Sequence, residues 1–394
     1  MSEPRNVVVV GGGPAGSATA LLLARAGVEV RIVERARFPR RKVCGEYLNA
    51  GAVEALDRLG VLHAVKAASA PLRGVRLVAA GAPPVVLPFR RPALACARDV
   101  LDAILLDAAR AAGAVVEHAR AEDVMSEEGS ATGVVVRTES GELEERPAMY
   151  TVGADGAGSF VARRCELEKR PPRSARYAVG GHYEGFRGLD GHVEMYVGGG
   201  AYFALNPLSE VCANVMVVVP KERLSEWSRD VDAGVGGAAA VLAGGVRSFD
   251  GVTRLGPRMA IGPLANGRRT AYQADVVLVG DAAGFLDPFT GQGVYLALTG
   301  AERAAAAMAE ALRTSGSRFA PLERYARWRA RDAVWRARLS KAVALLVDVP
   351  LLARRAAARI ERFPEAGAAL IDALSGVVPP QRAFRPGVLG RLLA

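Results

Sequence analysis

The sequence is poor in the residues that build disulfides and metal sites. Only four cysteines and four histidines occur among its 394 residues, and no two cysteines form a C-x-x-C pair. A disulfide framework and a Cys/His zinc site are therefore not expected, and this cysteine usage is typical of a reducing compartment. No metal ion is predicted.

Long apolar runs are also missing. The first six residues are polar and lead directly into a strand-like run, so no secretion signal is expected. The longest apolar stretch near the end, residues 342–353, is too short to span a bilayer and contains Asp348. We therefore expect a cytoplasmic protein without a transmembrane helix.

Lysine is scarce, although the chain is basic. Only five of the 51 basic residues are lysine, and residues 321–362 contribute +7 of the net charge of +10. In that segment Tyr325, Trp328 and Trp335 alternate with arginines, a mixture that suits peripheral contact with the inner face of a membrane. The favoured alternative is a solvated helical face that packs on the rest of the protein. No nucleic-acid-binding module accompanies the charge, so nucleic acid is not an expected partner.

Hydrophobic residues and glycine, in contrast, are abundant. Hydrophobic residues make up 51% of the chain and charged residues 23%, and the 44 glycines follow no period, as in a globular protein. The length predicts two closely associated domains or one large nucleotide-binding enzyme.

The N-terminal residues predict a βαβ unit. Residues 6–10 and 28–33 read as buried strands, and the helix between them, residues 14–26, ends at Gly27. The first strand is followed by Gly11-x-Gly13-x-x-Gly16, and Glu34 closes the second. In such a turn the first glycine permits the tight bend, the second lets the backbone approach a pyrophosphate, and the third allows close packing. Amides at the helix start would bind the anion and Glu34 the ribose hydroxyls, which predicts a dinucleotide site.

The remaining chain shows two different residue patterns. From about residue 174 the sequence is aromatic and punctuated by glycine, which predicts an antiparallel sheet in a separate layer. Before and after that insertion, the pattern is that of a parallel α/β domain, and helices are expected from residue 317 to about 374. The main elements expected are strands at 114–118, 133–138, 149–152, 176–186, 192–197, 201–206, 211–219 and 274–279, and helices at 99–112 and 293–312.

A second glycine-rich motif follows the strand at 274–279. Asp281 at the end of this strand is placed to accept hydrogen bonds from sugar hydroxyls, and the alternative role is that of a helix N-cap. Gly291-Gln292-Gly293 opens the next helix, so free N–H groups and the positive end of the helix dipole face a ligand there. For a flavin, this ligand edge is the one formed by N1 and the C2 carbonyl.

These motifs together resemble the FAD-dependent superfamily of para-hydroxybenzoate hydroxylase-type monooxygenases, geranylgeranyl reductases and flavin-dependent halogenases. The resemblance covers nearly the whole chain and includes the pair Asp155-Gly156. It implies an α/β (α+β) fold with a Rossmann-like FAD-binding domain on a parallel sheet, an inserted antiparallel-sheet substrate domain and C-terminal helices. The expected boundaries are 1–75, 98–172 and 255–315 for the FAD-binding domain, 76–97 and 173–254 for the substrate domain, and 316–394 for the helices.

The resemblance also implies FAD as cofactor, NAD(P)H as reductant and a set of binding residues. Arg98 matches a family arginine at the ribityl or phosphate region, Asp155 and Gly156 would serve FAD and transient nicotinamide binding, and Pro288 would flank the isoalloxazine ring. The residues expected at the cofactor are Gly11, Gly13, Pro14, Ala15, Gly16, Glu34, Arg35, Cys44, Gly45, Arg98, Asp155, Gly156, Gly280, Asp281, Pro288, Gly291, Gln292 and Gly293.

The sequence indicates the superfamily more clearly than it indicates which of its enzyme types this chain represents. Aromatic hydroxylases usually carry a histidine where this chain has Gly284, and the segment from Lys42 to Glu46 is similar to that of geranylgeranyl reductase-like enzymes. The W-x-W-x-I-P signature of tryptophan halogenases is missing, which disfavours halogenation. The sequence narrowly favours hydroxylation of an aromatic or lipophilic natural-product intermediate through a flavin C4a-hydroperoxide, with O2 as co-substrate. The alternative is reduction of a prenyl C=C bond.

No Ser/His/Asp set or carboxylate pair suggests a protein-borne catalyst, because in this superfamily the cofactor carries the chemistry. The catalytic candidates are His182, Tyr183, Tyr202 and Cys44, and the substrate candidates are Tyr196, Phe203, Pro288 and Phe289. Strand alternation allows only one of His182 and Tyr183 on the inner face. For each aromatic residue, packing within the sheet is an equal alternative, and an unpaired cysteine is more often inert.

Overall fold

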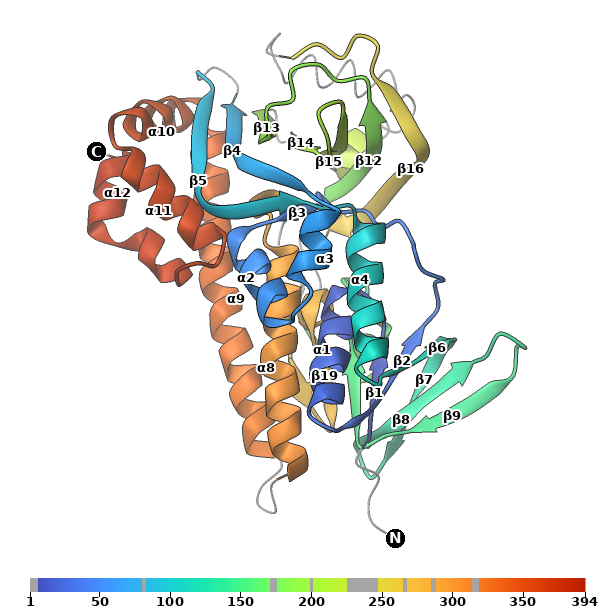
Figure 1. Ribbon diagram of the computed structural model, residues 1–394. Helices are drawn as coiled ribbons and strands as arrows, with labels where there is room; N and C mark the ends of the chain where they lie inside the picture. The colour runs from blue at the N-terminus through green and yellow to red at the C-terminus, as the bar shows by residue number, and fades with distance from the viewer. Residues whose placement is uncertain are drawn as a thin grey trace.

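The computed structural model describes residues 6–79, 83–170, 176–198, 201–224, 247–264, 268–284, 288–313 and 319–393. Within these ranges a parallel sheet with its helices forms one layer of the molecule, and a second, larger sheet lies beyond it (Figure 1). Helices at the C-terminus pack beside both. The expected fold class is confirmed.

The parallel sheet has the strand order β18-β19-β10-β1-β2-β6, in which only β18 runs antiparallel. Its strands are short and β-branched because both faces are covered. They are β1 (Asn6–Val10), β2 (Glu29–Glu34), β6 (Val115–His118), β10 (Tyr150–Gly153), β18 (Tyr272–Gln273) and β19 (Val276–Leu278).

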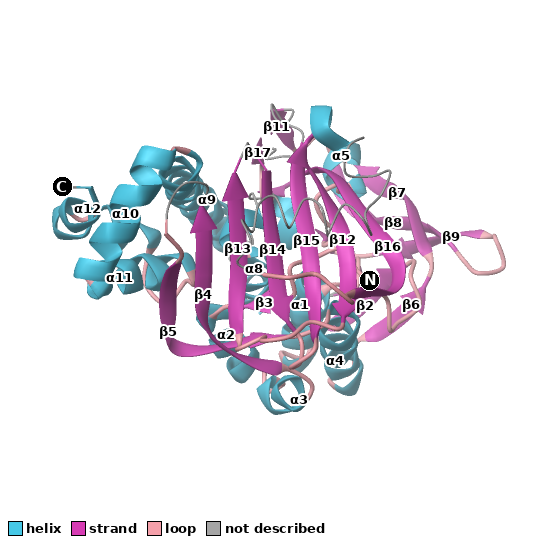
Figure 2. Cartoon of the chain, turned by 90° about the horizontal axis from the view of Figure 1, so that it is seen from above, coloured by secondary structure: helices cyan, strands magenta, loops and turns pink. Residues whose placement is uncertain are grey.

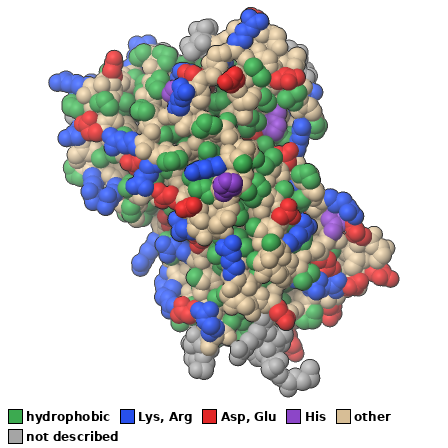
Figure 3. Space-filling model, in the orientation of Figure 1, with side chains coloured by type: hydrophobic (Ala, Val, Ile, Leu, Met, Phe, Trp, Pro, Cys, Tyr) green, Lys and Arg blue, Asp and Glu red, His purple; other side chains and the backbone are tan. Residues whose placement is uncertain are grey.

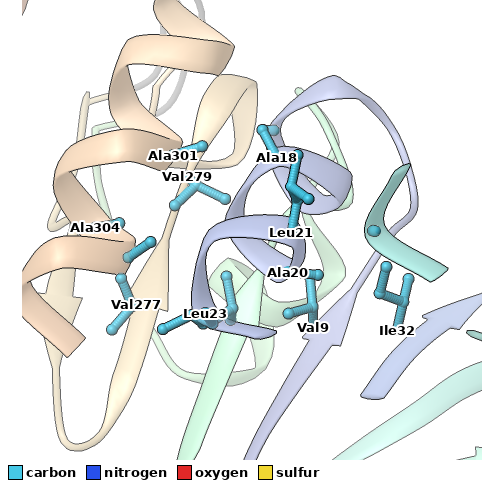
Figure 4. Close-up of a cluster of buried hydrophobic side chains, with 14 of the residues drawn as sticks. Val9, Ala18, Ala20, Leu21, Leu23, Ile32, Val277, Val279, Ala301 and Ala304 are labelled. Carbon is cyan, nitrogen blue, oxygen red and sulfur yellow. The ribbon is translucent and has the colours of Figure 1, made fainter. Parts of the chain in front are cut away.

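Alanine-rich helices cover this sheet. Helix α1 (Pro14–Arg25) packs between α4 (Arg98–Ala111) and α8 (Gly293–Arg313). Figure 4 shows the small side chains that let these helices come close to one another and to the strands, among them Ala18, Ala20, Val277, Ala301 and Ala304. The largest buried core of the described chain lies here.

Smaller elements complete this layer. A three-stranded antiparallel sheet, of which only the middle strand was expected, packs beside the parallel sheet through β8. The elements are β7 (Arg120–Glu127), β8 (Ser130–Arg137), β9 (Leu143–Pro147), α2 (Ala50–Arg58), α3 (Leu62–Ala67), α5 (Phe160–Arg164), β11 (Glu168–Arg170) and β17 (Arg268–Arg269).

The second large sheet has the order β16-β12-β15-β14-β13-β4-β5-β3, and Figure 2 shows its strands side by side. It is antiparallel except between β13 and β4, which run parallel because no hairpin joins them. The sheet extends beyond residues 76–97 and 173–254, the bounds that the sequence indicated for the substrate domain. One reason is that prolines and glycines obscure the strand pattern of β16. Its strands are β3 (Tyr47–Leu48), β4 (Ala70–Ala79), β5 (Val85–Ala95), β12 (Arg176–Glu184), β13 (His192–Gly198), β14 (Ala201–Pro207), β15 (Cys212–Pro220) and β16 (Thr253–Leu264).

The two faces of this sheet pack against different partners. Alternate residues such as Tyr183, Tyr196 and Phe203 form an outer apolar cluster that includes Phe249. The intervening residues, such as Ala178 and Tyr202, form an inner cluster with residues of the C-terminal helices. The period of two along each strand produces this division.

The C-terminal residues form a helical bundle against the inner face. Three of its α-helices and its 3-10 helix begin with proline, which suits the first helical position. In the part of the chain that the structure describes, no helix meets the length and apolarity that a bilayer span requires. The elements are α9 (Phe319–Asp348), α10 (Pro350–Arg362), α11 (Pro364–Leu374), η4 (Pro380–Phe384) and α12 (Pro386–Leu393).

A buried ionic network in the large sheet gives a stability prediction. The Glu194 carboxylate accepts hydrogen bonds from Arg76 Nη1 at 2.9 Å, Arg247 Nε at 2.7 Å and the Tyr196 hydroxyl at 2.5 Å. Replacing it by Gln keeps the shape but leaves Arg247, whose side chain is 9% exposed, without its charge partner, so we expect a loss of about 1–3 kcal/mol in the free energy of unfolding. Urea unfolding measures this loss. As a control, Glu144→Gln removes an exposed partner of Arg146 and should change little.

Candidate functional site

The sequence motifs meet at one edge of the parallel sheet. Strands β1, β2, β10 and β19 run parallel to one another, so the residues after their carboxyl ends lie together. These are the Gly11–Gly16 turn, Glu34, Asp155 and Asp281. This is the position at which open α/β sheets bind ligands.

The three glycines of the first turn have different roles. A Cβ on Gly11, which has φ +105°, would lie 2.6 Å from the Ala154 carbonyl oxygen, and one on Gly16 would lie 1.9 Å from the Gly11 carbonyl oxygen. Both glycines are therefore required for packing. Around Gly13 only Arg40 Nη2 comes near, at 3.6 Å from a Cβ. The start of α1, where Pro14 and Ala15 are buried, thus presents its amides toward open space.

Glu34 is buried and held by the backbone. Its Oε2 accepts a hydrogen bond from the Gly12 amide at 2.7 Å, and its Oε1 accepts one from the Ala36 amide at 2.8 Å. Arg35 beside it is exposed. These bonds fix the carboxylate at the end of β2 and leave it further lone pairs for sugar hydroxyls.

Asp281 lies in the 3-10 turn η2 (Gly280–Ala283), which one residue separates from β19, and Gly280 approaches Ala15 closely. Its carboxylate makes no hydrogen bond with any residue that the structure describes, so the helix-capping alternative is not observed. Burial raises the pKa of Asp281, while the cations Arg329, Arg98, Lys42 and Arg269 oppose that rise. An unsatisfied carboxylate within a cationic group suits a ligand with hydroxyl donors.

The second glycine-rich motif is fixed by polar contacts. The turn η3 (Pro288–Thr290) precedes Gly291, whose carbonyl oxygen accepts a hydrogen bond from Asn49 Nδ2 at 3.2 Å. The buried Gln292 Oε1 accepts one from Arg336 Nη1 at 2.6 Å, so this side chain ties the motif to α9. Gly293 at the start of α8 is exposed, and a Cβ there would contact nothing within 4 Å.

Arg98 and Asp155 are both engaged within the protein. The Arg98 guanidinium forms two hydrogen bonds with Asp102, Nε to Oδ1 at 2.7 Å and Nη2 to Oδ2 at 2.8 Å. Burial alone would lower the pKa of Arg98, but Asp102 and Cys44 together outweigh burial and raise that pKa. Asp155 accepts from Ser159 Oγ and the Phe160 amide, both at 2.6 Å, and so caps α5. Gly156, which has φ +86°, leaves open space beside it.

The substrate and catalytic candidates divide between the two faces of the large sheet. Tyr202 lies on the inner face and its ring contacts Phe289 edge-on at a centroid distance of 5.1 Å. His182 also faces inward, where its Nε2 lies 2.7 Å from Glu46 Oε2. Three candidates are not brought to this face: Tyr183, Tyr196 and Phe203 pack in the outer cluster.

Cys44 and Gly45 lie in the segment before β3. The Cys44 Sγ accepts a hydrogen bond from the Glu46 amide at 3.3 Å. Its carbonyl oxygen accepts one from Asn214 Nδ2 at 2.6 Å, and the Gly45 carbonyl oxygen accepts one from Asn206 Nδ2 at 3.0 Å. Neither asparagine nor Glu46 was a candidate from the sequence, because no motif marks a side chain whose role is to hold a neighbouring backbone.

Several arginines at the site were also missed. Arg329 and Arg336 belong to the basic C-terminal segment, yet both are buried, and Arg329 Nη2 donates to the Gly280 carbonyl oxygen at 3.0 Å. Arg269 Nη1 donates to the Asp281 carbonyl oxygen at 3.3 Å. Arg329 and Arg336 therefore hold the second glycine-rich motif, Gly280-Asp281 with Pro288 to Gly293, which we call the flavin motif, so these two arginines are not part of a solvated face. On the surface seen in Figure 3, basic side chains are interspersed with acidic and hydrophobic ones.

The arrangement fits the FAD that the resemblance implies. The amides at the start of α1 and the space at Gly13 suit a pyrophosphate. Glu34 and Asp281 can accept hydrogen bonds from sugar and ribityl hydroxyls, and the α8 start suits the electron-rich edge of a flavin. The cations around Asp281 would offset part of the negative charge of the FAD phosphates.

Comparison with known proteins gives consistent results. A model of the family described as FAD binding domain matches residues 5–338. Digeranylgeranylglycerophospholipid reductase 1 of Methanopyrus kandleri is 32% identical over 337 residues, which cover 82% of this chain and 85% of that protein. A 1H-pyrrole-2-carbonyl peptidyl-carrier protein brominase of Pseudoalteromonas luteoviolacea is 25% identical over 324 residues, 79% of each chain.

Solved structures share the fold. A flavin-dependent brominase has a TM-score of 0.82 at 22% identity and covers 94% of this chain and 93% of its own. A geranylgeranyl bacteriochlorophyll reductase-like protein from Thermoplasma acidophilum has a TM-score of 0.72 at 21% identity and covers 99% and 96%.

Proposed function

The chain belongs to the FAD-binding-domain family of FAD-dependent oxidoreductases, and we propose that it is a reductase that saturates a C=C bond of a lipophilic, isoprenoid-like substrate. In this proposal NAD(P)H supplies the reducing equivalents. The proposal reverses the order that the sequence narrowly favoured, and the reason lies in the inner face of the large sheet.

The apolar surroundings of Phe289 carry the proposal. Phe289 follows Pro288 in the flavin motif and packs with Tyr202 against the inner cluster. The apolar members of that cluster come from the segment before β3, the large sheet and the C-terminal helices. They include Val43, Met195, Val197, Val218, Leu339, Val343, Leu374 and Phe384.

Such surroundings suit an isoprenoid chain better than a polar aromatic ring. An apolar chain gains roughly 25 cal/mol for each Å² that it buries. A phenol would need polar partners for its hydroxyl group, or it would lose its hydrogen bonds with water. The identity with a lipid reductase over most of the chain adds support to this choice.

Bound FAD, once reduced, would supply the hydride for such a reaction. The chain's own residues bind and orient the cofactor through the edge at Gly13, Glu34 and Asp281. The inner cluster would hold the substrate and exclude water from the reacting atoms. Saturation of the C=C bond also takes one proton on the second carbon, which would come ultimately from solvent, so the overall reaction would consume NAD(P)H and one proton.

Hydroxylation remains the second candidate, because His182 places one ionisable group on the inner face, where it could bind a phenol.

Peripheral membrane contact also stays a prediction. Leu345 and Leu351, 58% and 65% exposed, lie near the junction of α9 and α10, close in sequence to Lys341, Arg354 and Arg355. Apolar side chains with basic neighbours suit the uptake of a substrate from an anionic lipid surface.

An anaerobic single turnover distinguishes the reactions. We expect FAD-loaded protein, reduced by NADPH under argon, to convert geranylgeranyl diphosphate or a menaquinone to a product heavier by two hydrogens. Mass spectrometry of the extracted substrate measures this change, and a sample without NADPH is the control. If a product forms only after O2 is admitted and carries one added oxygen, the reductase assignment is wrong and hydroxylation takes its place.

A further inference from the structure

The segment from Lys42 to Asn49 includes the edge strand β3 and contacts both the strands β12, β15 and β14 of the large sheet and the flavin motif. The Tyr47 ring packs so closely on Gly291 that a Cβ there would lie 2.5 Å from Tyr47 Cδ1. Asn49 Nδ2 donates to the Gly291 carbonyl oxygen at 3.2 Å. The position of this segment therefore sets the position of the turn that opens α8.

Three polar side chains in one row of the sheet hold the segment from the other side. His182, Asn214 and Asn206 are direct register partners on the adjacent strands β12, β15 and β14. The two asparagines donate to the carbonyl oxygens of Cys44 and Gly45. His182 contacts the next residue, Glu46, through its side chain. The row thus contacts three consecutive residues.

Glu46 is the most constrained of these three. It is 2% exposed and has φ +56°, a conformation that costs a non-glycine residue free energy unless its surroundings enforce it. Its Oε1 accepts the backbone amide of Arg98 at 2.9 Å, while Oε2 contacts His182. One carboxylate thus joins the segment to the start of α4 and to the large sheet.

We propose that Glu46 and His182 are positioning residues of the flavin site, and that their buried ion pair fixes the segment from Lys42 to Asn49 against the FAD-binding edge. Loss of the proton from His182 would weaken this pair and with it the binding of FAD. The proposal rests on FAD binding by this family, and it does not depend on which reaction follows.

The charges around His182 support a protonated state. The hydrogen bond with Glu46 raises the pKa of His182 above its ordinary value, while burial opposes that rise. Arg41 from the preceding loop lowers the pKa, and Asp99 from α4 raises it. The register partners Asn214 and Leu255 on the neighbouring strands carry no charge. Because the pKa is raised, the ion pair is present at low pH and is lost as the pH rises through that pKa.

Titration of the apoprotein with FAD between about pH 6 and pH 9 tests the proposal, with the variants Glu46→Gln and His182→Gln. We expect the wild-type Kd for FAD to increase with pH. Each variant should bind FAD about tenfold more weakly at the low end of this range, because it breaks a buried charge pair, and should show little pH dependence. The double variant should bind FAD no more weakly than either single variant.

His192→Gln is the matched control. His192 Nδ1 lies 2.9 Å from Asp190 Oδ1, so it also forms a histidine–carboxylate pair in the large sheet, but on β13 and away from the segment. This variant should keep the wild-type Kd and pH profile. The proposal is overturned if the Glu46 and His182 variants lower only the Tm and keep the wild-type Kd and flavin absorption spectrum. Failure to reduce a C=C bond would contradict the proposed reaction and leave this test unaffected.

Discussion

A Gly13→Val variant is expected to fold normally and to purify without bound FAD. Gly13 has an ordinary φ of −74°, and the nearest atom to a Cβ there is the end of the flexible Arg40 side chain, at 3.6 Å. The added methyl groups would instead fill the space before the α1 amides. Losing the pyrophosphate contacts there forfeits charge-assisted hydrogen bonds of about 1.5–3 kcal/mol each, so FAD should bind at least about a hundredfold more weakly.

The flavin absorbance of the purified protein and a titration of the apoprotein with FAD measure this loss, and circular dichroism reports folding. Gly16→Ala gives the contrast, because its Cβ would lie 1.9 Å from the Gly11 carbonyl oxygen and should destabilise the fold itself. A yellow Gly13→Val protein with the wild-type Kd would show that the pyrophosphate does not approach this turn.

The sequence predicted the parallel domain well because its signals are local. The strand at Asn6–Val10, the helix at Pro14–Arg25 and the strand at Glu29–Glu34 lie within one or two residues of their expected bounds. Each is bounded by a glycine, a proline or an end to the β-branched run. The strands β7 and β9, in contrast, are polar, β7 being largely half-buried and β9 largely exposed, so no hydrophobic pattern marks them.

The faces of the large sheet were not predictable from the sequence. Alternation shows that His182 and Tyr183 point in opposite directions, but both sides of β12 are buried. With two buried faces, no polar side distinguishes inner from outer. Only the packing of the C-terminal helices against Tyr202 and Ala178 identifies the inner face.

Motif residues in this site have roles that a motif alone does not reveal. Asp155 uses its carboxylate to cap α5, and Gln292 uses its amide to bind Arg336 and Thr290. Both side chains form hydrogen bonds within the protein, so neither is a free side chain at the edge of the sheet. The motifs contain three carboxylates, Glu34, Asp155 and Asp281. Backbone amides bind the first two, and only the Asp281 carboxylate has no hydrogen bond to a described residue.

An Asp281→Ala variant is therefore expected to lose FAD while its apoprotein becomes no less stable. Burial is the largest influence on the pKa of Asp281 and raises it above 3.8, so the ionised carboxylate costs the native state free energy once the pH exceeds the raised pKa. Alanine removes that cost, and the Tm of the apoprotein at neutral pH should stay the same or rise. FAD, however, loses the acceptor for its hydroxyls, so its Kd should increase roughly 10- to 100-fold. The Kd for FAD of Asp281→Asn, which keeps an acceptor oxygen without the charge, should lie between those of the wild type and Asp281→Ala. Differential scanning calorimetry of the apoproteins and FAD titration separate the two effects, and an Asp281→Ala protein that is less stable but binds FAD as tightly as wild type would assign Asp281 to the fold instead of the site.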